Sequence, residues 1–264
     1  MQLKLGKNQV RLDRRTLRLT SIFRELPPIP DKYDCDSQFN FPIEDTMDGN
    51  DRWGNCVVVA RAKNTRRFES LEQKKQFDIP EIYILKEYWK EGGRNPIKPY
   101  PDCGLVMLDS ERAWRKGWKI CRDTYSIYAF GFIDPKIEED VKSTIYLLNG
   151  INLGFELPIS ALGQFQRGET WTVVDGNEGL AGSWGGHAIY MKRYDKDLYY
   201  GLTWGKEQPM TKEFFLKYCS EAYGNVDDKD KFLTGSGIDI EKLGNYLLAV
   251  SHVREGGELP TKFR

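Results

Sequence analysis

Apolar residues recur at helical spacing through the first half of the chain, after an opening segment of about 45 residues that shows little periodicity. Cys56 opens an apolar, helix-like stretch over 57–68, and Pro80 precedes Ile82, Leu85 and Trp89 at spacings of three and four. Two further apolar stripes have helical spacing. The first consists of Met107, Trp114 and Trp118 and ends near Gly117. The second follows Asp134-Pro135 and consists of Ile137, Val141, Ile145 and Leu148. The pattern predicts four helices before residue 150.

After Gly150 the pattern becomes strand-like. Short runs rich in β-forming residues cover 151–157, 187–194, 198–204 and 246–253, with one more helix expected at 212–223, ending at Gly224. A glycine-rich loop, 175–186, separates the first two runs. This segregation predicts an α+β fold with two lobes. We expect an extended N-terminal arm (1–45), a helical lobe (46–150) and an antiparallel β lobe (151–264).

The amino-acid composition makes some classes of protein unexpected for this chain. Among 264 residues, Lys and Arg together equal Asp and Glu at 39 each, so a nucleic-acid partner is not expected, and the basic stretch 11–18 is short and mixed. No run reaches membrane-spanning length and the first residues lack the apolar core of a signal peptide. We therefore expect a cytoplasmic protein with no membrane partner.

The five cysteines form an odd set without metal-ligand spacing, and only two histidines accompany them: Cys35, Cys56, Cys103, Cys121 and Cys219, with His187 and His252. A metal or other cofactor is therefore not expected. In a reducing compartment most of these cysteines should behave as small buried apolar residues, and the sequence leaves their disulfide state open. His252 has no partner motif, and we expect a structural role for it.

Cys56 and His187 carry the candidate chemistry. Cys56 follows a Gly-Asn turn at a predicted helix start, where a thiol can be made anionic, and His187 follows 131 positions later in a Gly-Gly-His-Ala run. That order and separation are typical of papain-type sites. The alternative reading is a buried core cysteine and a histidine satisfied at a sheet edge.

The flanking residues resemble those of the papain-like cysteine peptidases. The turn into Cys56 resembles the family's Gln-Gly-x-Cys-Gly-x-Cys-Trp segment, Asp102-Cys103-Gly104 its Cys-Asn-Gly-Gly segment, and Gly186-His187-Ala188 through Tyr194-Asp195 its histidine strand. Thr203-Trp204-Gly205 resembles the end of Asn-Ser-Trp-Gly. A fainter similarity, including Met210-Thr211 and Tyr218, is to papain-like proteins predicted in phage and prophage genomes, which would place the chain in a host cytoplasm or a virion.

The resemblance implies a role for each matching residue. Cys56 would be the nucleophile and His187 the acid and base, with Asn50 as oxyanion donor, although Asn50 could equally just shape its turn. Trp204 would shield the histidine, Gly104 would be a remnant of the substrate-binding glycines, and Trp184 would line the cleft or simply pack. Leu202 stands where the family has the asparagine that orients the histidine. A backbone carbonyl, Thr203 or Asp175 could replace it, and the sequence does not choose among them.

Three functions remain open at this point. The resemblance predicts a thiol hydrolase that cleaves peptide or isopeptide bonds in a peptide or protein substrate. The departure at Leu202 favours instead a catalytically impaired scaffold, a structural or binding component of a phage particle whose N-terminal arm docks onto other structural proteins. A cysteine amidase acting on cell-wall peptides shares the same chemistry. We also expect the 45-residue arm to be too short for the family's inhibitory pro-segment.

Overall fold

An antiparallel sheet forms the frame of the computed structural model, which describes residues 3–23, 28–92, 102–227 and 239–252. Its strands lie in the order β4-β9-β5-β6-β7-β8, and β1 pairs with the far end of β6. Their bounds are β1 Tyr33–Asp34, β4 Ala129–Phe132, β5 Ile151–Leu157, β6 Gly185–Tyr194, β7 Leu198–Thr203, β8 Lys206–Thr211 and β9 Cys219–Val226. Central β5 pairs with β6 over the whole length of β5, from Ile151 opposite Met191 to Leu157 opposite Gly185.

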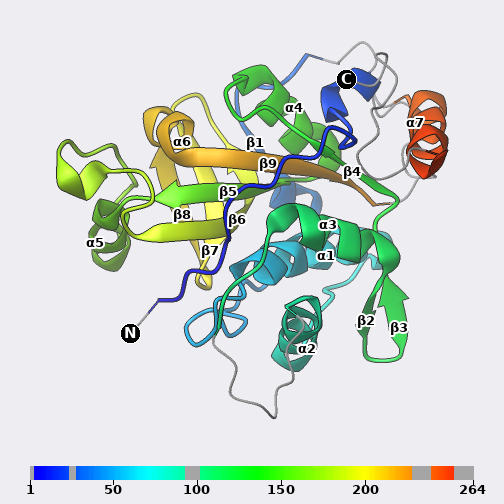
Figure 1. The fold of residues 1–264 in the computed structure, drawn as a ribbon, viewed down its shortest axis with the longest axis horizontal. Coiled ribbons are helices and arrows are strands. Elements are labelled where there is room, and N and C mark those ends of the chain that lie inside the picture. Colours follow the sequence, from blue (N-terminus) through cyan, green and yellow to red (C-terminus); the bar gives the residue numbers. More distant parts are fainter. Residues whose placement is uncertain (1–2, 24–27, 93–101, 228–238, 253–264) are drawn as a thin grey trace.

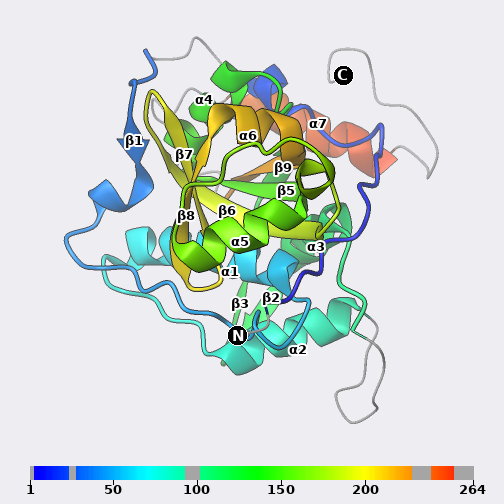
Figure 2. The ribbon, with the colours of Figure 1, turned by 90° about the vertical axis from the view of Figure 1, so that its left-hand side faces the viewer.

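A helical layer covers one side of this sheet. It consists of α1 (Cys56–Gln73), α2 (Glu81–Glu91) and α3 (Met107–Lys116), followed by a small hairpin of β2 (Trp118–Ile120) and β3 (Asp123–Tyr125). Figure 2 shows this layer below the sheet, with α4 (Glu138–Leu148), α5 (Ile159–Arg167) and α6 (Lys212–Tyr218) above or in front of it. Strand β4 belongs to this sheet and helix α4 packs against it. Both lie before residue 150, where the boundary between the helical lobe and the β lobe was predicted. The last helix among the described residues is α7 (Ile240–His252), and short 3-10 turns occur at Leu19–Ile22, Cys35–Gln38 and Asn177–Gly179.

Most of the predicted elements are confirmed, with small shifts at their ends. The four expected helices correspond to α1 to α4, and the strands 151–157, 187–194 and 198–204 correspond to β5, β6 and β7. Trp118 was wrongly placed on a helix. Gly117 ends α3 with a φ of 107°, a left-handed conformation that only glycine adopts readily, and Trp118 begins β2.

Two expectations about the second half of the chain are wrong. The helix predicted over 212–223 stops at Tyr218, because the following residues form β9 and pair with both β4 and β5. The strand predicted over 246–253 belongs instead to α7 as far as His252, and the remainder lies outside the described residues. Leu243 and Tyr246 are buried three positions apart, the spacing of a helix face. Strands β1, β3, β4 and β8 and helix α5 were not predicted.

Two apolar clusters lie on opposite faces of the sheet. One lies between the sheet and α4, α6 and the segment 17–22, and the other packs α1, α2 and α3 against the opposite face. Helix α1 is almost wholly buried, including Arg61, Lys63, Arg66 and Arg67. These charges are paired with acidic residues of the surrounding loops and of α2, which explains why the helix lacks a clear polar face.

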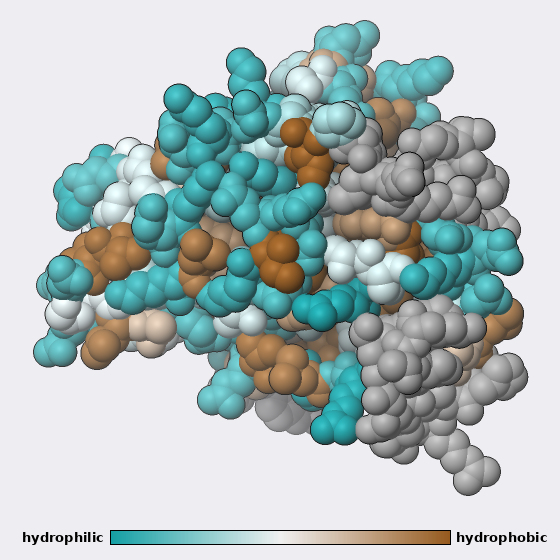
Figure 3. All heavy atoms as spheres, turned by 90° about the horizontal axis from the view of Figure 1, so that it is seen from above, coloured by the Kyte–Doolittle hydropathy of each residue, from teal (hydrophilic) through white to brown (hydrophobic). Residues whose placement is uncertain are grey.

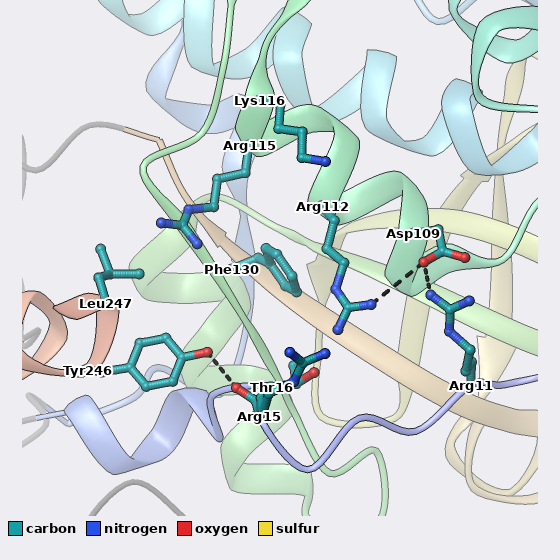
Figure 4. Close-up of a pocket in the computed structure, with 10 residues that line it drawn as sticks. All are labelled: Arg11, Arg15, Thr16, Asp109, Arg112, Arg115, Lys116, Phe130, Tyr246 and Leu247. Carbon is teal, nitrogen blue, oxygen red and sulfur yellow. Dashed lines mark hydrogen bonds and ion pairs between the residues drawn. The ribbon is translucent and has the colours of Figure 1, made fainter. Parts of the chain in front are cut away.

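The N-terminal segment, dark blue in Figure 1, begins between the sheet and the helical layer and then crosses in front of β5 and β9. It then passes a hollow of about 600 Å³ that is rich in basic side chains (Figure 4). There Arg11 pairs with Asp109 of α3, while Asp13 pairs with both Arg15 and Arg112. Leu17 beyond them is fully buried. Rather than extending into solvent, the described part of the arm is attached to its own chain along both layers.

The surface shown in Figure 3 is mainly hydrophilic, and hydrophobic side chains among the described residues of that face form small separate patches. Within the described ranges, no helix combines the length and the apolar character needed to cross a bilayer. In the same part of the chain, no group of three or more His, Cys, Asp or Glu side chains is arranged to hold a metal ion.

Candidate active site

Cys56 begins α1 at the end of a tightly held loop. The loop turns at Asp48 and Gly49, both with positive φ (55° and 78°), and the amide of Asn55 donates to the carbonyl of Asp48 at 2.9 Å. Asp102 accepts the N–H of Gly54 at 2.6 Å and also bonds the hydroxyl of Tyr88. These contacts place the thiol at the positive end of a helix, where an anion is favoured.

A buried ion pair anchors this loop to the helix that it precedes. Both nitrogens of the Arg66 fork donate to the carboxylate of Asp48 at 2.7 Å, and each side chain is only 2% exposed. Arg66 also donates to the carbonyl of Ile79 at 3.1 Å, and Lys63 lies 3.7 Å from Asp48. Such a bidentate pair fixes orientation as well as distance. The position of Cys56 therefore depends on a charge pair inside the helical layer.

His187 lies on β6 with its imidazole held on two sides. Its Nε2 is 2.6 Å from Oγ1 of Thr203, and its ring stacks on Trp204 at 4.1 Å between centroids and 11° between planes. Nδ1 is buried and has no hydrogen-bond partner among the residues that the structure describes. Trp204 is in turn packed by Trp184 at 5.2 Å. The ring is therefore oriented, with one nitrogen left for chemistry.

The strand that carries His187 also contacts the thiol. Ala188 donates its N–H to Sγ of Cys56 at 3.4 Å, while within the described chain no hydrogen bond links Cys56 directly to His187. Burial raises the pKa of the Cys56 thiol to about 11, although the N–H groups of Ala188, Gly6 and Val57 and the charge of Lys7 act in the opposite direction. Burial also lowers the pKa of His187 to about 3. Near neutral pH both groups are uncharged in this conformation.

Residues near the chain's own N-terminus lie across the site. Residues 3–8, called here the cleft segment, lie extended between the two walls of the site. The N–H groups of Gly6 and Lys7 donate to the carbonyl of Gly186 on the histidine strand, at 3.2 and 3.0 Å. On the other wall Leu105 donates to the carbonyl of Gly6 and accepts from Asn8, both at 2.8 Å. The segment thus bridges the sheet and the helical layer across the site.

Three residues predicted for the site contact this segment. The amide of Asn50 donates to the carbonyl of Lys4 at 3.4 Å and to that of Trp53 at 3.0 Å, and Trp204 Nε1 donates to the same Lys4 carbonyl at 3.2 Å. Gly104 has a φ of 65°, and a Cβ there would lie 2.1 Å from the Gly6 carbonyl oxygen. The structure therefore brings Asn50, Trp204 and Gly104 together around Cys56 and His187.

Leu202 and Asp175 do not contact the imidazole. Leu202 pairs with Tyr190 in the β6–β7 register and packs in the cluster around α1, whereas Thr203 faces the opposite side with His187. Asp175 is exposed in the glycine-rich loop. Of the substitutes considered from the sequence, the hydroxyl of Thr203 is the one in contact. Sequence reasoning missed the cleft segment, for which the only local signal is the glycine at position 6.

The protonation state of the Cys56 thiol gives a first prediction. Alkylation of Cys56 in the wild-type chain should keep rising up to pH 9, by about tenfold per unit, because only the thiolate reacts and the pKa of the thiol is about 11. The initial rate of modification by iodoacetamide, followed by intact-mass analysis of wild type and Cys56→Ala, measures it. A fast rate that is already constant from pH 5 would mean that a thiolate–imidazolium pair exists in this state.

Comparison with known proteins places the architecture. No family model matches the chain, and no curated protein sequence is similar to it. Among solved structures, xylellain, a cysteine protease from Xylella fastidiosa, has a TM-score of 0.66 at 15% identity over 86% of this chain and 97% of that one. Digestive procathepsin L 3 of Tenebrio molitor larval midgut has 0.56 at 10%, over 84% and 75%. The Carica candamarcensis cysteine protease CMS1MS2 has 0.52 at 12%, over 76% and 100%.

These likenesses define the fold class. The chain has the fold of the papain-like cysteine proteases, which confirms the predicted α+β architecture of helices and an antiparallel sheet. The predicted phage or prophage origin has no support among these structures.

Proposed function

We propose that the protein is a thiol hydrolase that cleaves peptide or isopeptide bonds through a Cys56 thioester. The single observation that carries this proposal is the juxtaposition of Cys56, at the start of α1, with the strand of an oriented His187 whose Nδ1 is unpartnered among the described residues. With Nε2–H donating to Thr203, the lone pair is on Nδ1, so the imidazole can act as a base toward the thiol.

The proposed reaction uses residues already placed in the site. Nδ1 takes the thiol proton, and the thiolate attacks the substrate carbonyl carbon. The amide of Asn50 and the N–H of Cys56 stabilise the oxyanion, and the imidazolium then gives its proton to the departing amine. Water, deprotonated by His187, hydrolyses the thioester and regenerates the thiol. The cleft segment must leave before a substrate can enter.

Turnover by a variant with an opened cleft tests the proposal. Gly6→Val is the opening change, because a Cβ on Gly6 would lie 1.8 Å from the carbonyl oxygen of Gly54. We expect Gly6→Val to cleave a library of internally quenched peptides, and we expect Gly6→Val combined with Cys56→Ser to be inactive. Gly244→Ala, where a Cβ meets nothing within 4 Å, is the matched control. A Gly6→Val chain that is labelled quickly at Cys56 but cleaves nothing would contradict hydrolysis.

That contrary result would favour the alternative function, a catalytically impaired scaffold that serves as a structural or binding component. In its narrowest form, this alternative makes the protein a component of a phage particle. Two observations favour it. Cys56 and His187 are uncharged in this conformation, and the cleft is filled by the chain itself. A scaffold would need the fold, including the filled cleft, but no turnover.

The contact between Thr203 and His187 gives a further prediction. Thr203→Val keeps the shape of the side chain but removes the oxygen next to Nε2. In the Gly6→Val background we expect kcat/KM to fall about fivefold, since one neutral hydrogen bond is worth about 1 kcal/mol. Leu202→Val, on the opposite face of β7, should leave kcat/KM within about twofold. Equal effects of the two substitutions would argue against Thr203 as the positioning residue.

A further inference from the structure

The side chain of Lys7 is buried in an acidic pocket, and its charge acts on the nearby Cys56 thiol. Its side chain is fully buried, and its Nζ lies 2.7 Å from Glu156 and 3.4 Å from Glu221. The Glu221 side chain is also fully buried, whereas that of Glu156 is 36% exposed. A lysine with no access to water is uncommon and requires this pairing.

The shape of the pocket fits a long unbranched side chain. Gly154 of β5 forms one wall, where a Cβ would lie 2.5 Å from Cε of Lys7 and 2.6 Å from Cγ of Glu221. The hydroxyl of Tyr223 bonds Glu221 at 3.1 Å and fixes the carboxylate. Gly154 is paired across the sheet with Ala188, whose N–H contacts the sulfur of Cys56. The pocket therefore opens directly beside the nucleophile.

The main-chain contacts of the cleft segment are open to any extended peptide. Gly186 and Leu105 bond backbone groups of Gly6, Lys7 and Asn8, and such bonds carry no sequence information. The side-chain pocket is where a peptide can be selected. We propose that the Glu156–Glu221 pocket selects a lysine or arginine side chain, close to the scissile bond, in the peptide that replaces the cleft segment. This rests on the proposed function only in that the selected peptide is the substrate.

Charge supports the same choice. Burial raises the pKa of Glu221 above its usual value even with the Lys7 ammonium beside it. An apolar or acidic side chain would remove the cation that opposes this rise, so the buried carboxyl would have to take up a proton or remain as an unpaired charge, and either change costs free energy. A lysine or arginine from the substrate restores the pair that Lys7 makes. In this proposal, the cleft segment binds in the site in the way that the selected peptide would bind.

Peptide binding to an opened, inactive chain tests the pocket apart from catalysis. The protein is the full chain with Gly6→Val and Cys56→Ser, and the probe is a blocked hexapeptide with the sequence of residues 3–8, Leu-Lys-Leu-Gly-Lys-Asn. Calorimetry should show this peptide, and one with arginine in place of the second lysine, binding about tenfold or more tightly than one with methionine there. Methionine at the first lysine should change little, because no ion pair joins Lys4 to any described residue.

The pocket variants identify the groups responsible. Glu221→Gln should remove most of the preference for lysine over methionine, and Gly154→Ala should weaken all basic peptides by filling the pocket. Equal affinity for the lysine and methionine peptides, or a preference that survives Glu221→Gln, would overturn the proposal. Turnover is not involved, so an inactive enzyme that still prefers lysine refutes hydrolysis alone, and an active enzyme without the preference refutes the pocket alone.

A second measurement covers the case in which Gly6→Val binds no peptide. In the otherwise wild-type chain, Lys7→Met should increase the rate of Cys56 alkylation about tenfold or more relative to Lys7→Arg, since only the arginine can keep the ion pairs. If Lys7→Met is labelled as slowly as wild type while remaining folded, the pocket does not hold its occupant through charge and the proposal fails.

Discussion

Gly6→Val should make Cys56 react with thiol reagents about 5- to 150-fold faster than in the wild type, because a clash that costs about 1–3 kcal/mol changes an opening equilibrium by that factor. The Cβ of a valine at position 6 would overlap the Gly54 backbone, with the carbonyl oxygen, the carbonyl carbon and Cα of Gly54 at 1.8, 2.3 and 2.5 Å. All three of these nearest atoms are backbone atoms, so no flexible side chain can move aside. We expect the cleft segment to leave the site.

The rate of iodoacetamide modification, with modified Cys56 identified by peptide mass analysis, measures this effect. Leu12→Ala is the matched control, because Leu12 lies on the same N-terminal segment but is 82% exposed. Its rate should equal that of wild type. A Gly6→Val chain that is folded by circular dichroism and labelled no faster than Leu12→Ala would show that the cleft segment does not limit access to the thiol.

Asp48→Asn should lower the free energy of unfolding by about 3 kcal/mol or more, because removing one partner of a buried ion pair leaves an uncompensated charge. Asparagine is the suitable replacement, since Asp48 has a φ of 55° and asparagine tolerates that conformation. The guanidinium of Arg66 would retain its bond to Ile79 but lose its carboxylate. Because this pair anchors the loop before Cys56, the thiol should also lose its fixed position.

Urea unfolding followed by tryptophan fluorescence measures the loss, with Glu81→Gln as the control. Glu81 pairs with Arg52 at the surface, where the two side chains are 40% and 58% exposed, and such pairs are worth about 0–1 kcal/mol. Burial raises the pKa of Asp48, but Arg66 and Lys63 outweigh it and the pKa is lowered overall. The stabilisation is therefore present at neutral pH and is lost on acidification. Equal losses for the two variants would contradict a buried anchor.

Local sequence patterns were sufficient to predict an element or a candidate residue where one residue type or one hydrophobic period indicates it. The order of Cys56 and His187, the Gly-Asn turn and the runs that became α1, β5, β6 and β7 could all be recognised along the chain. Asn50 and Trp204 were predicted from short motifs that resemble those of the papain-like peptidases, the turn before Cys56 and Thr203-Trp204-Gly205. Each of these motifs and runs is a local pattern of a few residues.

Patterns failed where pairing across the fold decides the outcome. The stretch after Tyr218 resembles a helix by itself but becomes β9 because β4 and β5 supply its hydrogen bonds. The residue that contacts the imidazole is Thr203 and not Leu202, because side chains alternate across β7 and only one of these two faces His187. Neither result can be read from one segment alone.

By itself, the sequence determined that the chain is an α+β protein with a cysteine at a helix start and a later histidine on a strand, because hydrophobic period and turn residues act locally. Only the tertiary structure decided that residues 3–8 fill the site, that Thr203 contacts the imidazole, and that Lys7 pairs with Glu156 and Glu221. These contacts join residues up to 214 positions apart, between Lys7 and Glu221. Their energies come from burial and charge compensation, which exist only once the layers have packed.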